Sequence, residues 1–90
     1  MKKIRSFNIS FRQLRLNNIL KLSYNKQGVK KSDEGKFKEA LEYFTKAIEL
    51  DPKDSLSYFN RATIQMQTGN IPAARSDFKL SASCGELVLS

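Results

Sequence analysis

The sequence predicts an all-α protein built from helical hairpins that stack on one another. Two observations predict this fold class. The chain repeats itself with a period of 34 residues, since the triplet Leu-Ser-Tyr occurs at residues 22–24 and again at 56–58. Apolar residues also recur at three- and four-residue spacing, which is the period of an amphipathic helix. A fixed period of this length is typical of repeat proteins, whose units bury their apolar faces against one another.

The repeat holds at small, aromatic and turn positions together. A shift of 34 residues pairs Gly28 with Ala62, Gly35 with Gly69, Phe37 with Ile71, Ala40 with Ala74, Phe44 with Phe78, and Ala47 with Ser81. Small residues let paired helices approach closely, and aromatic residues fill the space beside them. We therefore expect two units, at residues 21–54 and 55–88, after a basic segment at 1–20 and before a tail at 89–90.

Each unit is expected to contain two helices separated by a glycine. In the first unit, one apolar helix face contains Phe37, Ala40, Leu41, Phe44, Ala47 and Ile48. Pro52 ends this helix, because the residue before a proline avoids the helical region. In the second unit, Asn70 is a candidate N-cap after the break at Gly69. Pro72 then lies in the first turn, where its missing N–H costs little.

These residues resemble the tetratricopeptide repeat. The family's small residue, two alanines, aromatic residue and closing proline correspond to Gly28, Ala40, Ala47, Phe44 and Pro52. Residues 55–88 resemble a second, more diverged repeat, which departs from the family pattern at Ser81 and Glu86, where alanine and proline are usual. The resemblance implies a right-handed α-α superhelix of helical hairpins and a role as a non-enzymatic adaptor or scaffold.

The composition also favours an interaction protein over an enzyme. The chain of 90 residues, enough for one domain, has no histidine and one cysteine, Cys84. Most metal sites and most acid–base catalysis at neutral pH use histidine, so we expect no catalytic site, metal or cofactor. A single cysteine excludes an internal disulfide, which fits a reducing compartment such as the cytoplasm.

The resemblance implies a binding surface as well. In this family the first helices of successive repeats line a concave groove that holds an extended peptide or a partner helix. By that resemblance, the groove residues are Leu22, Asn25, Val29, Ser32, Leu56, Phe59, Asn60, Thr63 and Met66. Packing between the repeats is the alternative role for Phe59 and Met66. The expected partner is therefore a protein or peptide.

A more specific role, as a chaperone-binding co-chaperone, is disfavoured. Such family members hold a C-terminal carboxylate with a Lys and an Asn from the first repeat, an Asn from the second, and a Lys and an Arg from a third. Only Asn60 matches here, since Asn25 and Val29 stand where the first two groups would be. Holding two carboxylates needs several converging donors. The neighbouring Arg61 is expected to pair with Asp54 or Glu49, or to be solvated.

The N-terminal third of the chain is strongly basic. Residues 1–32 contain nine Lys and Arg and no acid, whereas the other 58 residues hold seven cations and nine anions, a net charge of −2. Residues 1–20 are open to four interpretations. They could be a helix packed on the first repeat, an organellar targeting segment such as a mitochondrial one, a segment that binds an anionic partner, or a disordered segment. Nucleic acid or an acidic membrane would bind through residues 1–31. The sequence does not establish a helix before about residue 11, because the apolar residues Phe7, Ile9 and Phe11 alternate with other residues as in a strand.

The ends of the repeat array add an expectation about assembly. Two repeats are fewer than the roughly three that such arrays usually need. The chain closes with the apolar residues Leu87, Val88 and Leu89 rather than with a polar capping helix. We therefore expect either a homodimer through the uncovered repeat ends or a chain of marginal stability.

Overall fold

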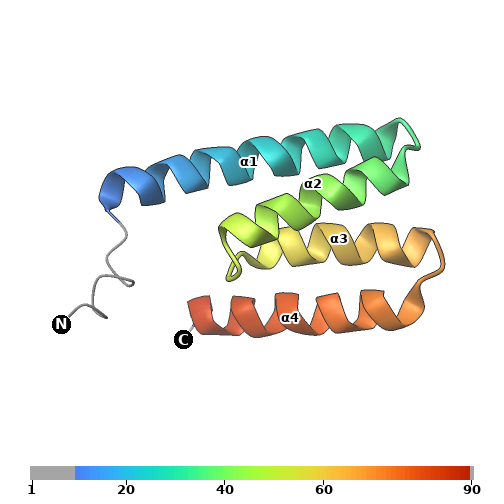
Figure 1. Ribbon diagram of the computed structural model, residues 1–90. Coiled ribbons are helices and arrows are strands. Elements are labelled where there is room, and N and C mark those ends of the chain that lie inside the picture. Colours follow the sequence, from blue (N-terminus) through green and yellow to red (C-terminus); the bar gives the residue numbers. More distant parts are fainter. Residues whose placement is uncertain (1–9, 90) are drawn as a thin grey trace.

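Four helices form two antiparallel hairpins in the computed structural model, which describes residues 10–89, with side chains up to residue 85 (Figure 1). The helices are α1 (Phe11–Asp33), α2 (Phe37–Leu50), α3 (Ser55–Gln67) and α4 (Ile71–Leu89). Helix α1 packs on α2 and α3 packs on α4, while α2 and, more lightly, α1 both contact α3. The predicted all-α fold of stacked helical hairpins is confirmed. In the described part of the chain, no helix has the length and apolar character needed to cross a bilayer.

Both hairpins turn at a glycine with a positive φ, 78° at Gly35 and 88° at Gly69. L side chains rarely adopt this conformation, whereas glycine does so without steric cost. After each glycine, the next amide donates to a carbonyl five residues earlier: Lys36 to Lys31 and Asn70 to Gln65, both at 2.8 Å. This Schellman arrangement satisfies carbonyls that the helix end leaves open. The predicted breaks at both glycines are confirmed.

The other helix ends also agree with the sequence. Helix α2 ends at Leu50, ahead of Pro52. Helix α4 begins directly after Asn70, whose side-chain Oδ1 accepts a hydrogen bond from the amide of Ala73 at 3.4 Å. Asp54 caps α3 in the same way, because its carboxylate accepts from the amide of Ser57 at 3.2 Å. Each cap satisfies an amide that has no partner within its own helix.

The core is centred on the ring of Phe44, which is 1% exposed and lies between α1 and α2. Gly28 on α1 makes this possible: a Cβ there would lie 2.7 Å from Cδ1 and 2.8 Å from Cζ of that ring. The predicted close approach of the two helices at Gly28 is therefore confirmed. In the second unit the equivalent Ala62 is fully buried, and Phe78 is half-buried beside it.

The N-terminal part of α1 differs from one of the expectations. Residues 11–20 do not form a separate helix covering the first repeat but continue α1, which is nine residues longer than α2 (23 against 14). Figure 1 shows this part of α1 projecting past the end of α2. Its large apolar side chains are 44–86% exposed, namely Phe11, Leu14, Leu16, Ile19 and Leu20. A helix of 14 residues is only about 21 Å long, so α2 is too short to face this part of α1. Residues 1–9 lie outside the described residues.

Helix α3 is tied to the preceding loop by Tyr58, which is 8% exposed. Its hydroxyl donates a hydrogen bond to the carbonyl oxygen of Pro52 at 2.8 Å. Burial raises the pKa of the Tyr58 phenol, with a smaller contribution from the Cys84 thiol. The neutral phenol is therefore the form that the fold stabilises.

Because the pKa of Tyr58 is raised in the folded state, its contribution to stability is complete below the usual tyrosine pKa of about 10 and is lost as the pH rises through the raised value. We expect the Tyr58→Phe variant to lose less stability above about pH 10 than the unmodified chain. Urea unfolding followed across this range measures the effect. Tyr43→Phe is the control, because it retains Tyr58. Identical alkaline slopes for Tyr58→Phe and the unmodified chain would contradict the burial of this phenol.

Replacing Gly28 by alanine tests the packing of α1 on α2. The added methyl group overlaps the buried ring of Phe44, so we expect Gly28→Ala to lower the free energy of unfolding by about 2 kcal/mol in spite of alanine's better helix propensity. The matched control is Gly85→Ala, where the new Cβ meets only Ser55 Oγ at an ordinary 3.7 Å. That variant should be neutral or up to about 1 kcal/mol more stable. Equal effects of the two substitutions on the urea midpoint would refute the proposed packing.

Candidate peptide-binding face on helices α1 and α3

The predicted groove residues lie on α1 and α3, and we call the surface that they share the α1–α3 face. Five of them are large apolar residues that remain substantially exposed: Leu22 (61%), Val29 (45%), Leu56 (54%), Phe59 (50%) and Met66 (46%). Helices α1 and α3 contact each other directly. Clustered exposed apolar side chains are a feature of interaction sites.

Phe59 packs on the second helix of its own unit. Its ring packs edge-to-face on Phe78 of α4, with ring centroids 5.6 Å apart and an interplanar angle of 63°. Half of the residue is nevertheless exposed. An aromatic ring that is held by a neighbour and still open to solvent loses little conformational freedom when a ligand packs on it. This fixed ring is therefore a suitable anchor for an apolar side chain of a partner.

The polar residues of this face differ in how much they offer to a ligand. Asn60 and Ser32 are half-buried, and no hydrogen bond of either side chain is found in the described region. Thr63 is also half-buried, but its hydroxyl donates to the carbonyl oxygen of Phe59 at 2.9 Å, within the same helix. On this face, the side-chain amide of Asn60 is therefore able both to donate hydrogen bonds to a ligand and to accept them from it.

Asn25 lies at the base of the α1–α3 face and is only 6% exposed. Its Nδ2 donates to Ser57 Oγ at 2.9 Å, and that hydroxyl in turn donates to Asp54 Oδ2 at 2.5 Å. The amide therefore joins α1 to α3 instead of standing in solvent. Its Oδ1 is buried without a partner among the described residues. Burying an unpaired acceptor is unfavourable.

An ion pair extends this chain of polar contacts. Lys21 Nζ lies 3.0 Å from Asp51 Oδ2 and 3.7 Å from Asp54 Oδ1. Asp54 thus accepts a hydrogen bond from Ser57 at Oδ2, while its Oδ1 forms an ion pair with Lys21. These contacts hold α1 against the α2–α3 loop and the start of α3. They set the relative position of the two helices that carry the candidate site.

Arg61 pairs with Asp77 of α4, so the expected partners Asp54 and Glu49 were wrong. Its Nε and Nη2 lie 2.6 and 3.0 Å from the two carboxylate oxygens of Asp77, and Nη1 donates to Thr45 Oγ1 at 3.1 Å. The hydrogen bond to Asp77 raises the pKa of Arg61. A sequence signal exists for this pair: both residues lie eight positions from Gly69, so the antiparallel hairpin brings them opposite each other.

The first unit uses a different contact between its two helices. Tyr24 of α1 and Tyr43 of α2 lie with ring centroids 6.1 Å apart. The ammonium group of Lys46 is 5.6 Å from the centroid of Tyr24 and 5.7 Å from that of Tyr43. A cation over an aromatic face is attracted by the ring's quadrupole. This contact fixes the side chain of Lys46 against the α1–α2 hairpin.

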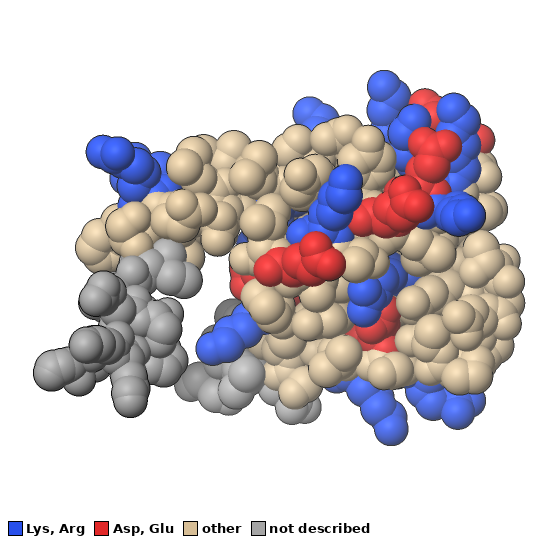
Figure 2. All heavy atoms as spheres, viewed as in Figure 1, with Lys and Arg blue, Asp and Glu red and all other residues tan. Residues whose placement is uncertain are grey.

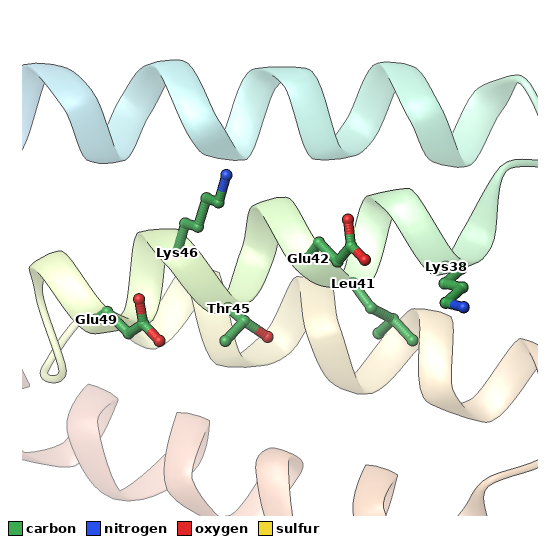
Figure 3. Close-up of a pocket in the computed structure, with 6 residues that line it drawn as sticks. All are labelled: Lys38, Leu41, Glu42, Thr45, Lys46 and Glu49. Carbon is green, nitrogen blue, oxygen red and sulfur yellow. The ribbon is translucent and has the colours of Figure 1, made fainter.

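A shallow hollow of about 450 Å³ lies on α2, outside the predicted groove (Figure 3). Its lining residues all belong to that helix and are Lys38, Leu41, Glu42, Thr45, Lys46 and Glu49. Cations and acids alternate along it, and Leu41 is its one large apolar side chain. The hollow contains none of the predicted groove residues.

Two family models match the sequence, and both are described as tetratricopeptide repeat. One matches residues 22–54 and the other residues 43–76. The chain belongs to the tetratricopeptide repeat family. The first match covers nearly all of the first predicted unit, and the second extends through α3 into α4.

Two relatives are similar to parts of this tetratricopeptide repeat protein. Tetratricopeptide repeat protein 6 of Homo sapiens is 48% identical over 44 residues, which is 49% of this chain and 8% of that protein. An uncharacterised protein of Methanocaldococcus jannaschii is 42% identical over 55 residues, 61% of this chain and 64% of that protein. The chain thus covers less than two thirds of the length of either relative.

The Arg61–Asp77 pair provides a test of how the second hairpin is held. Asp77 is 4% exposed, so Asp77→Ala leaves the guanidinium of Arg61 unpaired and partly buried. We expect this variant to lose about 2–3 kcal/mol of unfolding free energy in urea titrations. The control is Glu39→Ala, which removes the exposed partner of Lys31, 3.2 Å away, and should change stability by less than about 1 kcal/mol. If both variants lose the same amount, Arg61 does not join α3 to α4 in the way described.

Proposed function

We propose that this chain is an interaction module that binds an apolar peptide or helix of a partner protein across the α1–α3 face. Tetratricopeptide repeats in general mediate protein–protein interaction. The observation that supports this site is the set of five large apolar side chains left exposed on two adjacent helices, two from α1 and three from α3. Burying them against a partner removes apolar surface from water, which is the main favourable contribution to association.

The chemistry of the face suggests what the partner offers. Phe59, held by Phe78, provides a rigid apolar anchor, and Met66 provides an adaptable one. Asn60 supplies an amide that pairs with a partner's backbone in either direction. Lys26, which neighbours both Leu22 and Val29 on α1, favours an acidic residue at the edge of the bound segment. The proposed ligand is therefore a short segment with two or three apolar side chains and a flanking acid.

An adaptor or scaffold role in the cytoplasm, without catalysis, belongs to the same proposal. The family is typically a non-enzymatic interaction module, and we extend this role to the present chain. A second copy of the chain could cover the exposed apolar surface instead of a peptide, and the array of two repeats led us to expect such a homodimer. The two are separable, because a homodimer forms in solutions of the chain alone as its concentration rises, whereas peptide binding requires the added peptide.

We expect peptides selected from a displayed random library against the full chain to bind the α1–α3 face. Leu22→Ser with Leu56→Ser should weaken their affinity by roughly tenfold or more, because both residues are highly exposed and their loss removes contact area without disturbing the core. The matched control is Leu14→Ser with Leu80→Ser, which removes leucines of similar exposure elsewhere, at 47% and 43%. Titration calorimetry measures both variants.

The same experiment separates the alternatives. Asn60→Ala should weaken binding by a few-fold if its amide pairs with the peptide backbone. Equal affinity of the two leucine double variants for the selected peptides would overturn the site. Analytical ultracentrifugation checks the homodimer. A dimer that is broken by Leu22→Ser with Leu56→Ser would assign this face to a second copy of the chain.

A further inference from the structure

Six exposed residues form one line along α1, on the side opposite the buried contact at Gly28. They are Arg12, Arg15, Ile19, Ser23, Lys26 and Lys30, and we call this line the outer ridge. Successive members lie three or four positions apart, which keeps them on one side of a helix. At about 100° per residue, the four cations of the ridge fall within about 60° of one another around the helix axis.

Ion pairing separates the cations of α1 into two groups. Lys21 and Lys31 lie off the ridge and pair with acids, Lys21 with Asp51 at 3.0 Å and Lys31 with Glu39 at 3.2 Å. Within the described residues, none of the four ridge cations forms an ion pair. Asp33 follows on the same side at the C-terminal end of α1. The positive charge that the fold leaves uncompensated on this helix is therefore concentrated on its outer face.

The distribution of charge can be followed in Figure 2. Lys and Arg atoms at the N-terminal end of α1 have no acidic atoms beside them, whereas cations and acids alternate over α2. The preceding residues 1–9 add Lys2, Lys3 and Arg5 and no acid to the sequence. The exposed cations at the N-terminal end of α1 attract anions over a long range, because no acid of the described residues lies beside them in this view.

Large aliphatic side chains occupy the middle of the ridge. Ile19 is 54% exposed on the ridge itself, and Leu16 and Leu22 flank it at 47% and 61%. The cations stand at the two ends, as the pairs Arg12–Arg15 and Lys26–Lys30. With a rise of about 1.5 Å per residue, the ridge is about 27 Å long. A straight basic line with an apolar centre is thus presented to solvent.

We propose that the outer ridge docks the chain on an anionic lipid surface, with α1 lying parallel to the plane of the membrane. The two cation pairs face lipid phosphates or carboxylates, and the central aliphatic side chains enter the boundary between headgroups and acyl chains. A nucleic acid duplex fits this pattern less well, because its phosphates would engage the cations but leave the exposed aliphatic side chains between them without apolar contact.

Flotation of the full chain with vesicles tests this proposal. Vesicles of phosphatidylcholine containing phosphatidylserine should bind the chain, and pure phosphatidylcholine vesicles should bind it far less. The ridge variant changes Arg12, Arg15, Lys26 and Lys30 to glutamine. The matched control removes the same net charge elsewhere by changing the exposed residues Lys38, Lys53, Arg75 and Lys79 to glutamine. A third variant, Ile19→Gln, tests the apolar centre, and circular dichroism verifies that every variant keeps its helices.

The ridge variant should lose roughly several-hundredfold in partitioning, since each cation near an anionic surface contributes about a fivefold factor. The control should lose far less, and Ile19→Gln should lose a few-fold while leaving the salt dependence unchanged. Equal losses in the ridge and control variants would overturn the proposal, as would no binding to the charged vesicles. Tighter binding to duplex DNA or to polyglutamate than to the vesicles, abolished by the ridge variant, would overturn it in favour of those partners.

Discussion

The contact between Gly28 and the ring of Phe44 sets the geometry on which the rest of the molecule depends. Because Gly28 has no Cβ, α2 approaches α1 closely enough for the largest fully buried side chain of the core to lie against the backbone of α1. This contact fixes the rotation of α1. One side is buried against α2, the adjacent side meets α3 through Asn25, and the outer side carries the ridge cations. Both proposed surfaces follow from this single orientation.

The two units reach the same arrangement with different chemistry. The first relies on close packing at Gly28 and on the tyrosine pair beneath Lys46. The second has Ala62 at the equivalent place and joins its helices with the bidentate Arg61–Asp77 pair. Phe78 is less deeply buried than Phe44, and its ring packs against Phe59 of the α1–α3 face.

Local signals in the sequence were sufficient for the helices and turns. The positive φ at Gly35 and Gly69, the cap at Asn70 and the close approach at Gly28 depend on residues whose conformational or steric limits are intrinsic. The 34-residue register also placed the candidate binding residues on neighbouring helices. The burial of each side chain on those helices was harder to predict from the sequence, because it depends on which residues of another helix lie opposite that side chain.

Three particular differences show this limit. Asn25 is buried because Ser57 lies opposite it on α3, and Arg61 meets Asp77 because the second hairpin pairs positions equally distant from Gly69. Residues 11–20 are exposed because α2 ends before it reaches them. Periodicity within α1 reports that a helix forms there, but it carries no information on the length of the neighbouring helix.

The division of α1 into a packed part and an exposed part is the central claim, and residue-resolved hydrogen exchange tests it most directly. Amides of residues 24–32, which are held by α2 and α3, should exchange only through global unfolding and match the protection of the core helix around Phe44. Amides of residues 15–20 should exchange at least roughly tenfold faster, because α2 ends before it reaches this part of α1. Uniform protection along the whole of α1 would contradict this division.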